Sequence, residues 1–459
     1  MAAKSVMTTD ELFSRIAAEL RISKSLVRRL FEELTRTAIR ETKTKGVFVL
    51  PGVGRLVKTQ RKARRGINPF TAKITKVQPT SVANFRVDAG FVEHVGRIKY
   101  VKKMLFAADV SHVQKAREPA RIAAKTPKQP KHKYEVVRIF YATDREAVSG
   151  KRLTFGSRRN SSGSLSLGTC DVSIPQSHKV GKVERPSILR LEFREDPDKH
   201  FVIQSVTTKT DGEFYGDLSE SVGRSEKKEA FVFIHGFKVS FDDAVYRTAQ
   251  ISHDIQFRGA PILYSWPSNG SLYDYTPDLN NNDWTVDHLE IFLKDLVAKS
   301  GANVIHLIAH SMGNKALTSA LKQMSLTRTS SDPEFNQVVL TAPDVDASIF
   351  THLASLISAL AHKITLYVSS RDLALIASKK KNGSYPRAGD SRKQIVVVAG
   401  VDTVDASAVD TNFIGHFYYA ENRSVLSDIF YLFEAGKDPK DRFGMSPVQG
   451  PPPYWRFSP

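Results

Sequence analysis

The sequence predicts an α/β fold, in which a doubly wound parallel sheet follows a small α+β domain. Two observations support this prediction. From Tyr134 onward, short apolar runs alternate with stretches of helical spacing, which is typical of parallel strands joined by crossover helices. The excess positive charge is confined to the first 133 residues, which indicates a separate part of different character.

The central stretch of the second part is residues 303–314, NVIHLIAHSMGN. Its apolar, β-branched run predicts a buried parallel strand, and the following KALTSALKQM has helical spacing. A strand, a sharp turn at a serine and a helix together form a nucleophile elbow, here centred on Ser311. The elbow needs small residues two positions before and after the serine, where Ala309 and Gly313 stand. The alternative is an ordinary serine at the end of a strand.

The other elements of this part are predicted in chain order. Strands are expected at YEVVRIFYATD, FVIQSVTTK, AFVFIHGF, PILYSWPS, QVVLTAP, KITLYVSS and QIVVVAG. Helices are expected near Asp242–Phe257, near Thr285–Lys299 and over Ser424–Phe433. The run GSRRNSSGSLSLG is expected to be a loop, and the Pro- and Gly-rich tail at residues 436–459 is expected to lie on the surface.

Acyl transfer requires a serine, a base that takes its proton and an acid that orients the base. In hydrolases built on an elbow these residues follow the order Ser, Asp or Glu, His, each at the carboxyl end of a strand. Asp372 follows the strand KITLYVSS, and His416 lies between the last strand and the final helix. We therefore predict a triad of Ser311, Asp372 and His416.

Other acids and histidines compete for these roles. Asp344 is the main alternative acid, and the remaining ones are Asp346 beside it and Asp402, Asp405 and Asp410 before His416. Among the histidines, His306 lies in mid-strand and is expected in the core, His310 lies inside the elbow, and His235 is expected to shape its loop. The predicted oxyanion donors are the backbone N–H groups of Met312 and Phe237.

A set of strings spread from Phe140 to Tyr419 carries a family resemblance: FYATDRE, FIHGF, YSWPS, IAHSMGN, APDVD, LYVSSRD, GVDTVDAS and GHFYY. With these strings the second part resembles a bacterial α/β-hydrolase family of esterase/lipase-like proteins, a domain of unknown function. The resemblance implies hydrolysis of carboxylic esters through an acyl-enzyme. The natural ester substrate does not follow from it, because the fold hosts many chemistries.

The first part of the chain is strongly basic. The whole chain has a net charge of +19, yet residues 1–133 contain 30 Lys and Arg against 10 Asp and Glu, and the remainder is close to neutral. Amphipathic helices are expected from Thr8 or Thr9 to Leu20 and from Ser23 to about Thr42. Two such helices cannot bury both apolar stripes in so short a piece, so dimerisation is expected.

After Gly46 the pattern changes to strands. VFVL and GRLVKTQRKARRG are expected to be strands, NPFT a turn, KITKVQPTSVANFRV the returning strand and DAGFVEHVGRI a closing helix. With PGVGRL, the arm RKARRGINPFTAKI and Phe85, this order of elements resembles the HU/IHF family of bacterial histone-like proteins.

Members of that family are intertwined dimers whose arms follow the minor groove of double-stranded DNA and bend it. The resemblance places a wedge at Pro69 and implies DNA contacts by Arg61, Arg64, Arg65, Asn68, Pro69 and Lys73. Ala72 departs from the family, which usually has glycine there, and a positive φ at the arm tip is less favourable for alanine than for glycine. Val53 and Arg55 depart as well. A basic hairpin that contacts protein is the alternative.

The predicted domains are an HU/IHF-like domain at 1–100, a basic linker rich in Pro, Lys and Ala at 101–133, the α/β-hydrolase domain at 134–435 and the tail at 436–459. The single cysteine, Cys170, cannot form an intrachain disulfide, which favours a cytoplasmic setting. No signal peptide and no membrane span are evident. No His or Cys cluster has metal-ligand spacing, so neither metal nor cofactor is expected.

The predicted function is a serine esterase tethered to a dimeric, nucleoid-associated domain that binds and bends DNA. The alternative is an architectural DNA-binding protein whose hydrolase-like part binds a ligand without turnover. Labelling of Ser311 by a fluorophosphonate distinguishes the two.

Overall fold

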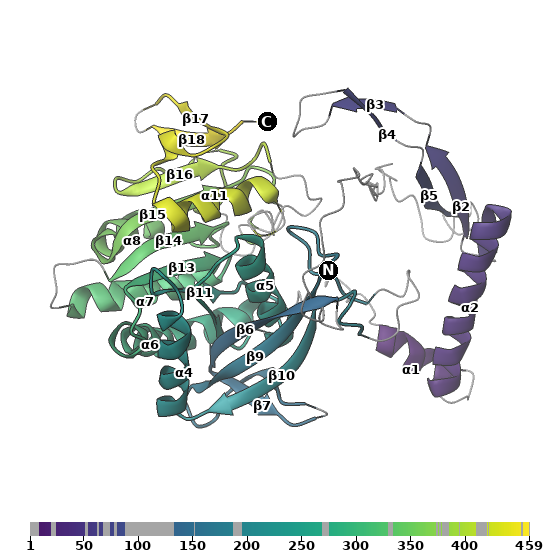
Figure 1. Ribbon diagram of the computed structural model, residues 1–459, viewed down its shortest axis with the longest axis horizontal. Coiled ribbons are helices and arrows are strands. Elements are labelled where there is room, and N and C mark those ends of the chain that lie inside the picture. Colours follow the sequence, from purple (N-terminus) through teal and green to yellow (C-terminus); the bar gives the residue numbers. More distant parts are fainter. Residues whose placement is uncertain are drawn as a thin grey trace, which may run out of the picture. The chain divides into compact units, whose positions relative to one another are not determined.

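A computed structural model gives the fold of the chain (Figure 1). It describes residues 9–19, 24–50, 54–61, 64–67, 74–77, 80–87, 133–150, 152–186, 195–268, 275–328, 334–372, 375, 378, 385–393, 395–409, 420, 422–450 and 453–458. These residues belong to two compact units, one N-terminal and one C-terminal, which are described separately.

The N-terminal unit begins with two helices, α1 (Thr9–Glu19) and α2 (Lys24–Lys45), as predicted. Phe13 and Phe31 pack against each other with ring centroids 5.1 Å apart. Gly46 ends the helical region with a φ of 79°, a conformation that glycine adopts without steric cost. A three-stranded antiparallel sheet follows, in the order β1 (Val47–Leu50), β2 (Gly54–Arg61), β5 (Thr80–Val87).

The predicted basic hairpin is one long antiparallel ribbon. Strands β2 and β5 pair from Gly54↔Val87 to Arg61↔Thr80. Strands β3 (Arg64–Ile67) and β4 (Ile74–Val77) then pair in the same register, from Arg64↔Val77 to Ile67↔Ile74. Because the register does not shift, the second pair is the direct continuation of the first, as the arrangement in Figure 1 also indicates.

The C-terminal unit is built on an 11-stranded mixed sheet, in the order β10-β9-β6-β12-β11-β13-β14-β15-β16-β18-β17. Neighbouring strands from β6 to β18 run parallel, whereas β9, β10 and β17 pair antiparallel at the two ends. The strands are β6 (Tyr134–Thr143), β9 (Ser166–Pro175), β10 (Val202–Lys209), β11 (Glu229–Ile234), β12 (Ala260–Ser265), β13 (Val304–His310), β14 (Phe335–Thr341), β15 (Ala361–Val368), β16 (Val401–Asp405), β17 (Met445–Val448) and β18 (Tyr454–Phe457). A separate hairpin joins β7 (Arg145–Val148) to β8 (Thr154–Arg159).

Helices cover both faces of this sheet, which makes it doubly wound as predicted (Figure 1). One hydrophobic cluster lies under α4 (Asp211–Gly223), α6 (Tyr275–Lys299), α7 (Gly313–Thr327) and α8 (Ala347–Ile357). A second cluster lies under α5 (Phe241–Asp254) and α11 (Arg423–Ala435) on the opposite face. Because both faces are buried, the central strands are apolar throughout, and every residue of β11 and β12 is buried.

Local signals in the sequence determine where several of these helices begin. Thr210 and Glu213 form a reciprocal capping box at the start of α4. Ser240 caps α5 by accepting from the backbone N–H of Asp243, and Asn422 caps α11 in the same manner. Gly436 ends α11 in the left-handed conformation that favours glycine.

Three predicted elements differ from the observed ones. Helix α6 begins at Tyr275, whereas the predicted helix begins near Thr285. The run QIVVVAG is not a strand over its described residues 395–400; Gly400 turns with a φ of 80°, and the strand is β16, which follows it. An apolar run of this length predicts a strand, but these residues are apolar because they pack against the core, where Val396 is buried. The carbonyl of Val396 accepts from the Thr403 hydroxyl rather than from the backbone of a neighbouring strand. The expected loop GSRRNSSGSLSLG instead contains the end of β8 and the start of β9.

The tail lies mostly on the surface, as expected, and its strands β17 and β18 also extend one end of the sheet. Strand β18 pairs parallel with β16, and Phe457 is 2% exposed. The predicted closing helix of the basic part and the linker at 101–133 lie outside the described residues, apart from Lys133. No helix in the described part of the chain combines the length and the apolar character that a membrane crossing requires.

Candidate active site

Ser311 occupies a strained turn between β13 and α7. Its φ is 52°, a left-handed conformation that is uncommon for residues other than glycine. The backbone N–H of Ser311 donates to the carbonyl of Thr341 at 3.0 Å, and its own carbonyl accepts from the side-chain amide of Asn314 at 3.0 Å. This geometry is the one that the nucleophile elbow requires.

Two glycines permit the close approach of the β11 loop to this turn. A Cβ on Gly313 would lie 2.5 Å from the carbonyl oxygen of His235, and one on Gly236 would lie 2.8 Å from the Cβ of Ser311. No real side chain tolerates such distances to a backbone atom. The predicted requirement for a small residue two positions after the serine therefore has a specific cause, which is the backbone of the β11 loop.

The predicted oxyanion donors lie on either side of this contact. Met312 follows Ser311 and is the N-cap of α7, so its peptide lies at the positive end of a 15-residue helix. Phe237 follows Gly236, where an added Cβ would lie 2.8 Å from the Cβ of Ser311. Asn282 donates to the carbonyl of Met312 at 3.0 Å and holds the turn from the opposite side.

A buried hydrogen-bond chain orients the loop that contains Phe237. The guanidinium of Arg145 is fully buried and lies 3.1 Å from Nε2 of His235, while Nδ1 of His235 lies 2.8 Å from the carbonyl oxygen of Gly236. Because arginine only donates, Nε2 of His235 must accept, and the proton therefore lies on Nδ1 and is donated to Gly236. That carbonyl belongs to the same peptide unit as the N–H of Phe237.

The charge states of the pair are consistent with this assignment. Burial lowers the pKa of His235 well below its ordinary value, and the neighbouring charge of Arg145 lowers the pKa further, so the ring is neutral. Burial lowers the pKa of Arg145 to about 10, which leaves it protonated at neutral pH. Trp266 stacks on the His235 ring at 5.2 Å and fixes its plane. His235 therefore shapes its loop, as expected.

The candidate acids follow the next strands of the sheet. Asp372 lies beyond the end of β15, is 2% exposed and accepts from the backbone N–H of Leu375 at 3.0 Å. Asp344 follows β14, and its carboxylate accepts from the hydroxyl of Ser378 at 2.5 Å and lies 3.4 Å from the guanidinium of Arg387. Two neighbours thus hold one oxygen of Asp344.

The remaining alternative acids have structural partners. Asp346 caps α8 by accepting from the backbone N–H groups of Ser348 and Ile349. Asp405 accepts from Ser407 and from Arg456, and Asp402 lies 3.5 Å from Arg442. Asp410 lies outside the described residues.

The four histidines considered for the site differ in their positions. His416 lies outside the described residues. His306 is a core residue as expected, fully buried and stacked on Phe433 at 3.9 Å. His310, the last residue of β13, is 1% exposed, and His235 belongs to the loop described above.

A cavity of about 240 Å³ adjoins the elbow on the α5 side of the sheet. Its lining includes Gly236 and His310, which flank Ser311, together with Lys238, Tyr246 and Arg247. The lining therefore combines aromatic and cationic side chains next to the serine.

The predicted DNA-contacting residues lie on the basic ribbon where the structure describes them. Arg61 is the last residue of β2, and Arg64 and Arg65 begin β3. Asn68, Pro69 and Lys73 lie outside the described residues. The register of the ribbon continues unshifted to Ile67↔Ile74.

Comparison with known proteins agrees with this geometry. The family model described as an alpha/beta hydrolase of unknown function (DUF900) matches residues 211–432, which include the elbow. Residues 211–432 are an α/β-hydrolase domain. The described sheet extends this hydrolase domain on the N-terminal side by β6, β9 and β10.

A second family model, described as bacterial DNA-binding protein, matches residues 7–96, which form an HU-like domain. Among solved structures, an Anabaena HU–DNA cocrystal structure is 27% identical and covers 19% of this chain and 97% of that chain, with a TM-score of 0.18. None of the curated proteins compared with the chain matches it. The chain thus combines a DNA-binding family domain with a hydrolase domain.

Sequence reasoning missed one important residue of the site, Arg145. It stands in the string FYATDRE, which carries the family resemblance but does not by itself indicate a role for the arginine. Its burial between β8, the β11 loop and the end of β12 depends on contacts to Gly156, Val239, Ser265 and Ser268, and no local pattern reveals them.

Proposed function

We propose that this protein is a serine hydrolase that cleaves carboxylic esters through an acyl-enzyme. The observation that carries the proposal is the left-handed Ser311 between a buried parallel strand and a helix, with the β11 loop packed against it. Such a turn costs of order 1 kcal/mol or more, and in α/β-hydrolases it presents the serine hydroxyl to the substrate and to backbone N–H donors. Ser311 itself is 2% exposed.

In the proposed mechanism His416 takes the proton of Ser311 as the hydroxyl attacks the ester carbonyl. The N–H groups of Met312 and Phe237 stabilise the oxyanion, and His416 then protonates the leaving alcohol. Water attacks the acyl-enzyme with His416 again as base, which releases the acid and regenerates the serine.

Asp372 is the proposed acid that orients His416. It is buried beyond the end of the second strand after the elbow, and its Oδ1 atom is positioned by the backbone N–H of Leu375. Asp344 is less suitable, because Arg387 and Ser378 already hold its Oδ1 atom. A carboxylate committed to a buried arginine is a weaker partner for an imidazolium.

For the HU-like domain we propose binding and bending of double-stranded DNA as a homodimer. The ribbon carries Arg61, Arg64 and Arg65 with no acidic residue between Arg55 and Arg86. On α2, Leu30 is 57% exposed and Leu34 is 36% exposed, one turn apart. Apolar side chains repeated at this spacing suit a helix that packs against a second copy.

DNA binding would keep the hydrolase with the nucleoid in the cytoplasm.

Fluorophosphonate labelling and a panel of p-nitrophenyl esters test the catalytic proposal. The native protein is expected to label and to turn over at least one ester, whereas Ser311→Ala loses both. Ser319→Ala, on the same α7 helix and half-buried, is the matched control and keeps both. Turnover by Ser311→Ala at the native rate would exclude the serine mechanism, and labelling of neither protein would favour a binding module without turnover.

A further inference from the structure

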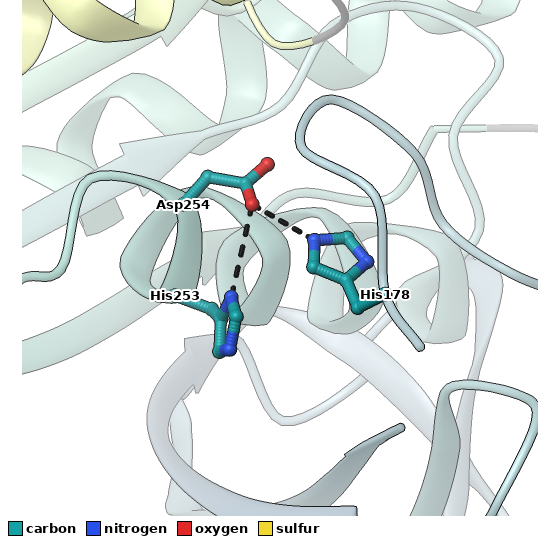
Figure 2. Close-up of side chains that lie close together, drawn as sticks. All are labelled: His178, His253 and Asp254. Atoms are coloured by element: carbon teal, nitrogen blue, oxygen red, sulfur yellow. Dashed lines mark hydrogen bonds and ion pairs between the residues drawn. The ribbon is translucent and has the colours of Figure 1, made fainter. Parts of the chain in front are cut away.

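A cluster of two histidines and an aspartate lies far from the candidate active site. His178 is in the loop after β9, and His253 and Asp254 are the last two residues of α5. Their ligand atoms lie within 4.8 Å of one another. Figure 2 shows both imidazole rings turned toward the same oxygen of Asp254.

The outward nitrogen of each ring is held by a carboxylate. Nδ1 of His178 lies 2.7 Å from Glu184, and Nε2 of His253 lies 2.7 Å from Glu135. Metal-binding histidines are held in this manner, because a carboxylate on the outer nitrogen fixes the ring orientation and increases the basicity of the inner nitrogen. Both rings of this cluster have that support.

Asp254 is oriented in a similar way. Its Oδ2 atom accepts from the backbone N–H of Gly181 at 2.7 Å and from the side-chain amide of Gln250 at 2.5 Å. The Oδ1 atom is thereby directed at the histidines, 2.8 Å from Nε2 of His178 and 3.7 Å from Nδ1 of His253. The Asp254 side chain is fully buried.

Nδ1 of His253 has an unusual environment. It is buried without a hydrogen-bond partner, although it faces a carboxylate oxygen. Nε2 of the same ring lies 2.7 Å from Glu135, so the two ring nitrogens face two different carboxylates. Next to an anionic oxygen, this nitrogen is stabilised either by a proton of its own or by a cation between the two atoms, and a separation of 3.7 Å is too long for a direct hydrogen bond. Two ligands of a tetrahedral zinc ion are about 3.3–3.5 Å apart, close to the separation of these atoms.

The charge balance also favours a cation. Three carboxylates, on Asp254, Glu184 and Glu135, surround two imidazoles, so one negative charge remains even when both rings are protonated. Within the described ranges no Lys or Arg forms an ion pair with any of the three. The carboxyl end of α5 adds its negative dipole.

We propose that His178, His253 and Asp254 bind a divalent transition-metal ion, for which Zn²⁺ is the best match. Two imidazole nitrogens and one carboxylate oxygen are ligands that zinc prefers. On binding, the metal replaces the proton shared by His178 and Asp254, and that proton is released to solvent.

The position of this metal site indicates a structural role. Glu135 lies at the amino end of β6 and Asp254 precedes β12, whereas Ser311 lies beyond the carboxyl end of β13. These strands run parallel, so the metal site lies at the amino ends of the strands and the elbow lies at their carboxyl ends. A bound ion would fasten the loop after β9 to the end of α5, next to the point where the chain enters the hydrolase domain.

Calorimetric titration of the chelator-treated full-length protein with Zn²⁺ tests the proposal, with Co²⁺ absorption as a report on coordination by nitrogen and oxygen. One equivalent is expected to bind and to raise the melting temperature, since a ligand that binds only the folded state stabilises it. His253→Ala is the decisive variant, because His253 is partly exposed and its removal leaves the buried pair His178–Asp254 intact. It is expected to lower Zn²⁺ affinity at least about 100-fold.

His352→Ala, which removes an exposed histidine of α8, is the matched control and keeps native affinity. Ester turnover should be the same with and without Zn²⁺, because the site is remote from Ser311. Absence of stoichiometric binding to the folded native protein, or equal affinity of the His253→Ala and His352→Ala proteins, would overturn the proposal.

Discussion

Arg145 and His235 form a buried pair in which the guanidinium determines the tautomer of the imidazole. The distance between Nη2 of Arg145 and Nε2 of His235 is 3.1 Å, and the Nδ1–H group of the ring donates a hydrogen bond to the carbonyl of Gly236. The peptide so held contains the N–H of Phe237, one of the two proposed oxyanion donors. Within the proposed mechanism His235 is therefore a positioning residue.

Replacement of His235 tests this role. His235→Leu removes the donor to Gly236 and is expected to lower kcat by about 100-fold with little change in KM, the size of effect that follows loss of one oxyanion donor. His235→Asn retains an N–H at a similar position and should recover at least a tenth of native kcat. Steady-state kinetics on one ester measures both, and equal kcat values for the two variants would mean that the hydrogen bond to Gly236 has no positioning role.

Gly313 should tolerate no side chain. Gly313→Ala places a Cβ 2.5 Å from the carbonyl of His235, so it either moves the β11 loop or destabilises the fold by about 1–3 kcal/mol. We expect at least a 100-fold loss of kcat/KM, with lowered stability in urea. Gly216→Ala is the control, since this exposed residue of α4 has no atom within 4 Å of the added methyl. It should stabilise the protein by about 0.5–1 kcal/mol.

The two candidate acids should differ in what their removal damages. Asp372→Asn is expected to lower kcat by about 10⁴-fold with a nearly native melting temperature, because a triad acid orients the base. Asp344→Asn leaves the buried Arg387 without its anionic partner, so it should cost about 1–3 kcal/mol of stability while the folded protein keeps kcat within tenfold. The reverse pattern would assign the acid to Asp344.

The elbow and the positions of most strands along the chain were predictable because they depend on local patterns. Strand β13 is a continuous apolar run, and glycine follows Ser311 at the position where the backbone of β11 approaches. The strand QIVVVAG was predicted wrongly because burial and strand pairing look alike in an apolar run. The structure distinguishes the two: the chain turns at Gly400, and pairing with β15 begins only after it, at Ile364↔Val401.

The His178 cluster could not be found from spacing. His178 and His253 are 75 positions apart in the sequence and are brought together by the sheet and by α5. The same holds for Arg145, whose partners lie up to 123 positions away. Motif reasoning detects sites whose residues share one turn or one strand end, and sites assembled by tertiary packing require the fold.

His288 should make stability depend on pH. Its Nδ1 atom lies 3.3 Å from the buried carboxylate of Asp144, and this hydrogen bond and charge raise the pKa of His288, with Asp287 contributing. A raised pKa in the folded state stabilises the protein below the unfolded pKa of about 6.5, and this contribution is lost as pH rises through the folded value. Urea midpoints should therefore show a larger deficit for His288→Gln at acidic than at alkaline pH. His352→Gln should show no such trend, and an equal deficit at both pH values would contradict the assignment.

The basic ribbon should give DNA binding a steep dependence on salt. Each phosphate contact releases counterions and adds about 0.9 to the slope of log affinity against log salt concentration. If Arg64 and Arg65 both contact phosphates, Arg64→Ala/Arg65→Ala should reduce the slope by about 2 and weaken binding to all duplex sequences alike.

Arg258→Ala/Lys440→Ala removes the same charge from exposed positions of the hydrolase domain and should leave the slope unchanged. Fluorescence anisotropy at several salt concentrations measures both variants. An equal slope for the two would mean that the ribbon does not contact phosphate through these arginines, and loss of slope in both would mean that net charge alone attracts the DNA.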